Sequence, residues 1–265
     1  MRVGIIGMGH VGSMMHTMLE PHAELVTYDA ADAGPYPKAE LAECDYVMVC
    51  VSTPPAQDGS CDVTNVEDAV RQCPAERIMI RSTVSPGTTA RLAADTGKHV
   101  VFCPEYVGES TYYNPLWPTA TAVPFLIVGG EPADRAWFID ALQPVLGPDK
   151  SYHQCSADEA ELIKYMENSF FAVKVIFAAE FRAICEAHGA DWHTVREGWL
   201  LDPRVEPSHT AVFASARGFG GKCLPKDLAA IIAAARAAGI EPLLLAAAAA
   251  VNARLRPTPA VHVAA

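Results

Sequence analysis

The segment Gly218-Phe-Gly-Gly-Lys-Cys223-Leu-Pro-Lys-Asp227 contains the most reactive side chain that the sequence suggests. It precedes an Ala-rich run typical of a helix, so Cys223 should lie at the start of that helix, beside Lys222. A helix amino terminus and a neighbouring cation both favour the thiolate, which is the nucleophilic form of cysteine. Asp227 follows Cys223 by four residues, about one helical turn. The alternative is a packed core thiol, the usual environment of a lone cysteine.

Lys164 and Asn168 are the second candidate pair. They lie in a run from 156 to about 188 that contains neither Pro nor Gly, which predicts one long helix. Residues four apart share a helix face. An ammonium and an amide on one face can stabilise negative charge that develops on a substrate oxygen. The alternative is a solvated helix face on which Glu161 pairs with Lys164.

Two polar loops each follow an apolar strand-like run. One is Ser82-Thr-Val-Ser-Pro-Gly-Thr88, which contains Thr83, and the other is Pro104-Glu105-Tyr-Val-Gly-Glu109-Ser110. Ligands of open parallel sheets bind beyond the carboxyl ends of the strands, where these loops should lie. The alternatives are that Glu105 and Glu109 are surface loop carboxylates and that Thr83 only caps or packs.

The Gly-rich turn Gly7-Met-Gly9-His10-Val11-Gly12 follows the first strand-like run and opens a helix, and Asp29 ends the next strand-like run. This context is typical of a dinucleotide site, in which an acidic residue binds the ribose hydroxyls and disfavours a 2′-phosphate. We therefore expect NAD rather than NADP, and the alternative is a structural turn with a surface Asp. The residues expected to bind the cofactor are Gly7, Gly9, His10, Val11, Gly12, Asp29, Val51, Ser52, Thr53 and Thr83.

The elements that must position these residues fall into two groups. Strand-like runs alternate with helical segments up to about residue 155, which predicts an α/β, Rossmann-type doubly wound parallel sheet over 1–155. Residues 156–255 read as helical and 256–265 as a disordered tail. The strands are expected at 2–6, 24–28, 46–51, 77–80, 100–103 and 125–128. The first helix follows the Gly-rich turn and ends at about 19, and further helices are expected at about 132–143, 156–188, 227–238 and from after 242 to about 255.

Composition excludes several classes of function. The 265 residues are 51% hydrophobic and 19% charged, which suits a globular chain with a sizeable core. The net charge of −11 argues against nucleic-acid partners and against a polybasic membrane contact. The eight cysteines include no CxxC pair, so a metal site is not expected and a reducing, cytoplasmic location is favoured.

At this point the chain resembles a known family, the UDP-glucose/GDP-mannose dehydrogenases. The matching pieces, in the family's order, are GMGHVG, STVSPGT, PEYVGES, the Lys164–Asn168 helix and GFGGKCLPKD, of which the last is the most specific. The resemblance covers residues 1 to about 255 and implies the family's Rossmann and helical middle domains. The family's C-terminal domain, which helps to bind the nucleotide of the substrate, has no counterpart here. The substrate is therefore open: a smaller nucleoside or glycoside, or a nucleotide sugar held also by a neighbouring subunit or by a separate protein.

The resemblance implies a two-step oxidation of a primary alcohol to a carboxylate with two NAD. Cys223 would form a thiohemiacetal and then a thioester, while Lys164 and Asn168 stabilise negative charge. Asp227 would activate a water that Thr83 and Glu109 hold. The resemblance also suggests substrate contacts by Glu105, Arg204, Phe219, Gly220 and Gly221. Arg204 departs most from the family, because the residues after it and its spacing to the Gly-rich turn differ.

The resemblance also implies a homodimer through the long helix, whose apolar residues include Phe170, Phe171, Val175, Ile176 and Phe181. The alternative is burial of these residues within the chain.

Two rival functions stay open. One is a beta-hydroxyacid-type dehydrogenase, which also has a Rossmann domain and a Lys-xxx-Asn helix but transfers a single hydride without a cysteine; GFGGKCLPKD speaks against it. The other is a catalytically inactive NAD-binding regulatory protein. The argument against it is that the chain contains all four candidate catalytic residues, Cys223, Lys164, Asn168 and Asp227.

Overall fold

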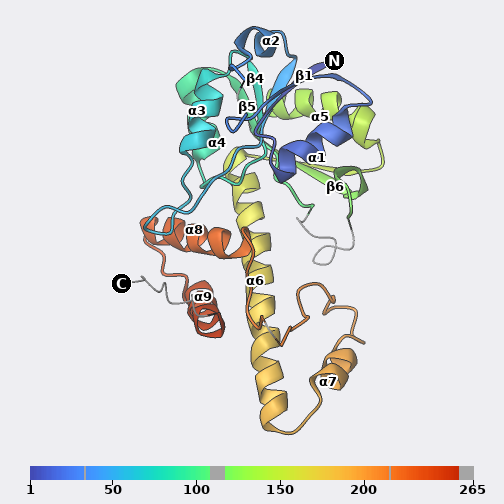
Figure 1. The fold of residues 1–265 in the computed structure, drawn as a ribbon, viewed down its shortest axis with the longest axis vertical. Helices are drawn as coiled ribbons and strands as arrows, with labels where there is room; N and C mark the ends of the chain where they lie inside the picture. The colour runs from blue at the N-terminus through green and yellow to red at the C-terminus, as the bar shows by residue number, and fades with distance from the viewer. Residues whose placement is uncertain (33, 108–116, 215, 257–265) are drawn as a thin grey trace. The chain divides into compact units, whose positions relative to one another are not determined.

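The computed structural model describes residues 1–32, 34–107, 117–214 and 216–256 (Figure 1). The chain divides into two compact units, Met1–Lys164 and Tyr165–Ala265, and each is described by itself. The division falls inside a helix, so the predicted domains 1–155 and 156–255 stay predictions. Of the predicted disordered tail, 257–265 lie outside the described residues.

A seven-stranded sheet forms the centre of the first unit and confirms the predicted α/β class. Its order is β2-β1-β3-β4-β5-β6-β7. Neighbours from β2 to β5 are parallel, β5 and β6 are antiparallel through the pair Phe102–Gly129, and β6 and β7 are parallel. The strands are β1 Arg2–Ile6, β2 Glu24–Tyr28, β3 Tyr46–Val49, β4 Arg77–Ile80, β5 His99–Phe102, β6 Phe125–Gly129 and β7 Ser151–Cys155.

Helices cover both faces of this sheet (Figure 1). Alternate residues of β3 point to opposite faces, as a pleated strand requires. Val47 and Val49 pack with residues of α3 and α4, whereas Tyr46 and Met48 pack with residues of α1 and α5. The helices of this unit are α1 His10–Leu19, α2 Lys38–Ala42, α3 Thr64–Gln72, α4 Thr88–Thr96, η1 Ala120–Ala122 and α5 Pro132–Leu146, together with the start of α6 Ala157–Ala187.

The long helix α6 begins with the capping box that the sequence pattern indicates. The backbone N–H of Ser156 donates to the Glu159 carboxylate at 2.7 Å, and the N–H of Glu159 donates to Ser156 Oγ at 3.3 Å. α6 ends at Ala187, close to the predicted end at about His188.

The second unit is helical. It contains the rest of α6, α7 Trp192–Trp199, α8 Leu224–Ala237 and α9 Leu243–Leu255. Ala172 and Ile176 of α6 form a core with Leu228 and Ile232 of α8 and with Ala248 of α9. In the part of the chain that the structure describes, no helix combines the length and the apolar character that crossing a bilayer requires. The cytoplasmic location stays a prediction from the cysteines.

Candidate active site

The turn between β1 and α1 has the shape of a dinucleotide cradle. Gly7 has φ +91°, and a Cβ there would lie 2.7 Å from the carbonyl carbon of Cys50. A Cβ on Gly12 would lie 2.9 Å from the carbonyl carbon of Gly7 and closer still to its oxygen. A Cβ on Gly9 would meet no described atom within 4 Å. The first and third glycines are therefore required by packing, whereas the second leaves the start of α1 open to a phosphate.

Asp29 is held toward this turn as a carboxylate. It accepts hydrogen bonds from the N–H of Met8 at 2.6 Å and of Ala31 at 2.9 Å. The bonds from Ala31 and then Met8 lower the pKa of Asp29, so it stays ionised at neutral pH. Each carboxylate oxygen has a further lone pair for a ribose hydroxyl. The predicted cofactor residues His10 and Val11 lie in the first turn of α1, with His10 exposed and Val11 half-buried.

The segments that follow β3 and β4 are joined to each other. Ser82 Oγ donates to the carbonyl oxygen of Val51 at 2.6 Å, and Cys61 Sγ donates to the carbonyl oxygen of Thr83 at 3.5 Å. Thr53 is buried, and Ser52, whose carbonyl oxygen accepts from the side chain of Asn65, is exposed. The structure therefore brings the predicted residues 51–53 and Thr83 together at the carboxyl edge of the sheet.

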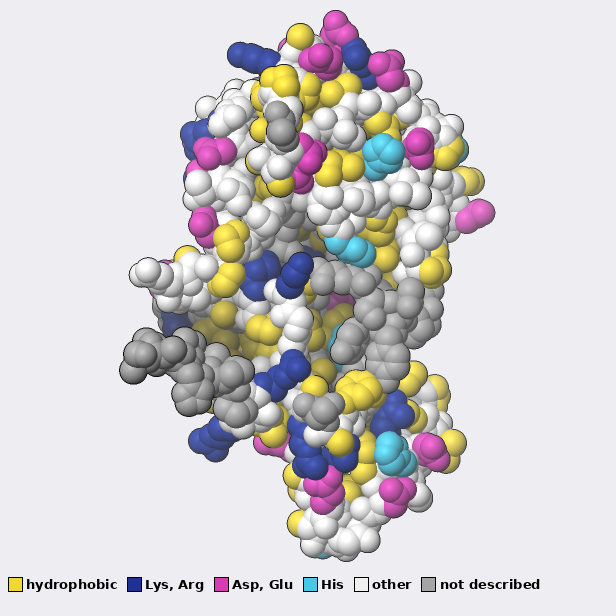
Figure 2. Space-filling view, viewed as in Figure 1, with side chains coloured by type: hydrophobic (Ala, Val, Ile, Leu, Met, Phe, Trp, Pro, Cys, Tyr) yellow, Lys and Arg dark blue, Asp and Glu magenta, His cyan; other side chains and the backbone are white. Residues whose placement is uncertain are grey.

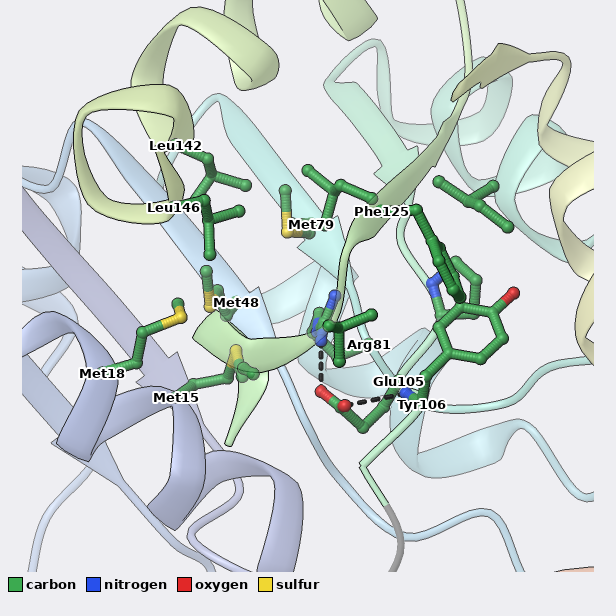
Figure 3. A pocket seen from close by; sticks show the side chains of 15 residues that line it. Met15, Met18, Met48, Met79, Arg81, Glu105, Tyr106, Phe125, Leu142 and Leu146 are labelled. Carbon is green, nitrogen blue, oxygen red and sulfur yellow. Dashed lines mark hydrogen bonds and ion pairs between the residues drawn. The ribbon is translucent and has the colours of Figure 1, made fainter. Parts of the chain in front are cut away.

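Glu105, after β5, is not a surface carboxylate. Only 9% of its side chain is exposed, and it forms an ion pair with Arg81 (Figure 3). Its Oε1 also accepts the N–H groups of Tyr106 and Val107, each at 2.7 Å. The carboxylate thus holds its own loop in shape. Arg81 was missed in the sequence, although a charge at the end of the apolar run Arg77–Ile80 needs a partner when buried.

Lys164 lies beside the same loop. Its Nζ donates to the carbonyl oxygen of Glu105 at 2.7 Å and lies 4.9 Å from the centre of the Tyr106 ring. In the first unit the structure therefore brings together Lys164 and Glu105. Glu109, which was predicted in this loop, lies outside the described residues.

A second cluster is built around the start of α8, in the second unit. Cys223 is the N-cap residue of α8 and is exposed, so it is not packed in the core. Asp227 is 1% exposed, and its N–H donates to the carbonyl oxygen of Cys223 at 2.8 Å. Its carboxylate accepts from Asn168 Nδ2 at 2.5 Å and from Lys226 Nζ at 2.6 Å. Asn168, Asp227 and Cys223 are therefore together, with a buried carboxylate one helical turn from an exposed thiol.

The Gly-rich turn before Cys223 is shaped by α9. Asn252 Nδ2 donates to the carbonyl oxygen of Phe219 at 3.1 Å, which the sequence did not indicate. A Cβ on Gly220 would collide with the guanidinium of Arg256, and Gly221 has φ +78°. The side chain of Phe219 is buried in the core of the second unit.

Arg204 lies in a loop of the second unit. Its side chain is 88% exposed, and its guanidinium binds the Asp202 carboxylate through Nε and Nη2. Its predicted contact with a substrate stays a prediction.

Known proteins resemble both parts of this chain. Models of the UDP-glucose/GDP-mannose dehydrogenase family match the chain twice, the NAD binding domain at residues 35–132 and the central domain at residues 158–254. UDP-glucose 6-dehydrogenase AglM of Haloferax volcanii is 33% identical over 238 residues, which are 80% of this chain and 53% of that protein. The putative UDP-glucose 6-dehydrogenase YtcA of Bacillus subtilis is 31% identical over 224 residues, which are 78% of this chain and 50% of that protein.

A solved structure of a UDP-glucose dehydrogenase from Pyrobaculum islandicum superposes with a TM-score of 0.79 at 27% identity, covering 96% of this chain and 68% of that one. The chain spans about half the length of the curated relatives it matches. The cradle at Gly7–Gly12 and the carboxylate of Asp29 fit the NAD for which the matching domain is named. The chain belongs to the UDP-glucose/GDP-mannose dehydrogenase family, and NAD is its cofactor.

Proposed function

We propose that this chain oxidises the primary alcohol of a nucleotide sugar, or of a related sugar or nucleoside, to a carboxylate in two hydride steps. The observation that carries the proposal is the exposed Cys223 at the start of α8, one turn from the buried Asp227 that Asn168 and Lys226 hold. Such an arrangement pairs a nucleophile with a fixed carboxylate. Two NAD, bound one after the other in the Gly7–Gly12 cradle, would each accept one hydride.

Cys223 acts on the aldehyde that the first oxidation leaves. Its thiolate adds to the carbonyl carbon, the C–S bond forms and the carbonyl oxygen takes a proton, which gives a thiohemiacetal. Loss of the second hydride and of the hydroxyl proton gives a thioester. Water then adds to the thioester carbon, the C–S bond breaks and the thiolate leaves, so the product is a carboxylate and the cysteine is regenerated.

Lys164, Asn168 and Asp227 serve these steps. The Lys164 ammonium and the Asn168 amide stabilise the negative charge on the substrate oxygen. Asp227 accepts a proton from the attacking water, which Thr83 and Glu109 hold. Glu105 contributes through its carbonyl oxygen, which orients the Lys164 ammonium.

The relatives named UDP-glucose 6-dehydrogenase support a nucleotide sugar as the substrate. The test is a screen of nucleotide sugars, nucleosides and glycosides for NADH formation, with the product analysed by mass spectrometry. We expect two NADH per alcohol and a product that has gained one oxygen and lost two hydrogens. A product that has only lost two hydrogens would favour the one-step rival, and NAD binding without any NADH would favour the inactive regulatory protein.

The variant Cys223→Ser tests the thioester directly. We expect it to stop at the aldehyde or to lose turnover, because a neutral hydroxyl is a far weaker nucleophile than a thiolate. Cys44→Ser is the control, since Cys44 is a half-buried thiol next to the Glu40 carbonyl. Unchanged two-step turnover in Cys223→Ser would reject the mechanism.

We further propose a homodimer that forms through α6 and α7. Several large apolar side chains of these helices are exposed, and Figure 2 shows hydrophobic side chains at the surface of this unit. They include Met166 at 77%, Phe170 at 58%, Phe177 at 44%, Phe181 at 42% and Val195 at 41%. A second copy of the chain would remove this apolar surface from water. Ile176 is excluded from this surface because it is buried within the unit.

A further inference from the structure

The second turn of α6 carries a buried carboxylate that none of the steps above uses. Glu161 is 0% exposed, and its two oxygens accept the backbone N–H of Gly87 at 2.6 Å and of Thr89 at 2.9 Å. These N–H groups belong to the amino terminus of α4, whose N-cap residue Gly87 has no side chain to cap it. Glu161 therefore satisfies two orphan donors of one helix from another helix, and its charge complements the dipole of α4.

The same turn of α6 reaches a second loop. Lys164, three residues after Glu161, donates to the carbonyl oxygen of Glu105. Glu161 holds the segment that follows β4, and Lys164 holds the segment that follows β5. One helical turn therefore joins the two loops in which the first unit presents Thr83 and Glu105.

We propose that Glu161 is a positioning residue: it fixes the Ser82–Thr88 segment, and with it Thr83, to the helical turn that carries Lys164. The consequence for catalysis rests on the proposed function, whereas the anchoring itself does not. A purely local cap would lie on the capped helix or just before it. Glu161 is 72 residues away from Thr89 in the chain, so the contact sets the distance between two separate parts of the site.

The electrostatics of the anchor give it a measurable signature. Burial raises the pKa of Glu161 to about 7, against the hydrogen bonds from Thr89 and Gly87, which lower it. On α6 the charge of Asp158 also raises this pKa. On α4, Arg91 and Asp95 are exposed and pair with residues of α3. A carboxylate can accept both N–H groups, whereas the protonated form offers one good acceptor.

The test is the amide NMR titration of Gly87 and Thr89 in the full chain, with and without Glu161→Gln. We expect the amide proton shifts of both residues to titrate near pH 7 in the wild-type chain and to stay flat in the Gln variant. Glu159→Gln is the matched control, because Glu159 lies two residues before Glu161 on α6 but is exposed and caps its own helix. Amide shifts of Gly87 and Thr89 that titrate equally in Glu161→Gln, or that this variant changes no more than Glu159→Gln does, would overturn the proposal.

Kinetics provide a second measurement that separates this proposal from the proposed function. With a substrate found in the screen, Glu161→Gln should lower kcat about tenfold, the effect of one lost hydrogen bond to a charged group. The Kd for NAD should rise by a smaller factor than kcat falls, because Thr83 is one of several predicted cofactor residues and the Gly-rich turn follows a different strand. An equal loss of NAD affinity would indicate general loosening and would contradict a positioning role. If no substrate gives NADH, the proposed function fails while the NMR titration still decides the anchor.

Discussion

Replacing Gly12 with Ala should lower the free energy of unfolding of the chain. The new methyl group would lie 2.9 Å from the carbonyl carbon of Gly7 and nearer to its oxygen. Relaxed contacts of this kind need about 3.5 Å or more, and both obstructing atoms belong to the backbone. The start of α1 would therefore have to move away from β1. Overpacking of this kind costs about 1–3 kcal/mol, and the gain from Ala over Gly in a helix offsets about 1 kcal/mol.

Because the new methyl group would lie 1.9 Å from the Gly7 oxygen, the cost should reach the upper end of that range, about 3 kcal/mol. The expected net loss is then about 2 kcal/mol, which lowers Tm by about 4–8 °C at roughly 2–4 °C per kcal/mol for a chain of this size. Gly9→Ala is the matched control. Its methyl group would meet no described atom within 4 Å, and its φ of −66° suits any residue. Folding should therefore be unchanged within about 0.5 kcal/mol, which is usual for surface substitutions.

NAD binding should show a different pattern from stability. The Gly9 methyl group would occupy the space through which the pyrophosphate approaches, so NAD affinity should fall by about tenfold or more. Thermal unfolding followed by circular dichroism and isothermal titration calorimetry with NAD measure the two effects. A Gly12→Ala chain as stable as wild type, or a Gly9→Ala chain that binds NAD normally, would refute this account of the turn.

Four further outcomes follow from the structure. Asp29→Ala should weaken NAD by about tenfold in calorimetry and raise the affinity for NADP relative to NAD, and an unchanged ratio would contradict the ribose contact. Asp227→Asn should lower turnover by about 100-fold, the usual scale for a general base, while the circular dichroism spectrum stays the same. Phe170→Asp should shift the dimer toward monomer in light scattering, and a wild-type chain that is monomeric at all concentrations would reject the dimer. The pKa of Glu161 is raised from 4.5 to about 7 in the folded chain, so the folded chain binds more protons than the unfolded chain between these pH values. The free energy of unfolding should therefore fall by about 3 kcal/mol as the pH rises from 4.5 to 7. Thermal unfolding of Glu161→Gln should show a flatter dependence on pH.

The sequence predicted the central strands well because they are apolar runs bounded by turn residues. β1, β2 and β4 begin and end at the predicted residues. β7 was missed because Ser-Tyr-His-Gln-Cys has no apolar run, and the strand lies at the sheet edge with three of its five residues exposed. The antiparallel pairing of β5 and β6 was missed because alternation of strands and helices does not specify direction.

The observed helices differ from the predicted ones in three places. α7 was missed, although Asp191 before it caps the N–H of Thr194 at 2.8 Å and is a local start signal. α8 begins at Leu224, before the predicted 227, because Pro225 in the first turn needs no hydrogen-bonded N–H. α5 continues to Leu146 past the predicted end, with Pro144 inside its last turn.

The candidate site residues could be predicted where they belong to short sequence motifs, as Gly7 and Cys223 do. The contacts of Arg81, Glu161 and Asn252 were not, because each partner is distant in the chain: 24 residues for Arg81 and Glu105, 72 for Glu161 and Thr89, and 33 for Asn252 and Phe219. A local pattern can show that a charge stands in apolar surroundings. Only the folded chain shows what neutralises it.

The place of Glu161 and Lys164 in α6 limits how this chain can be divided. A fragment cut at residue 155, where strand-like sequence stops, would lose both side chains and leave the N–H groups of Gly87 and Thr89 without their carboxylate. A fragment that continues through Lys164 would retain them. The opening turns of α6 are thus an inseparable part of the nucleotide-binding half, and any chimera that exchanges the helical half must splice the chain after them.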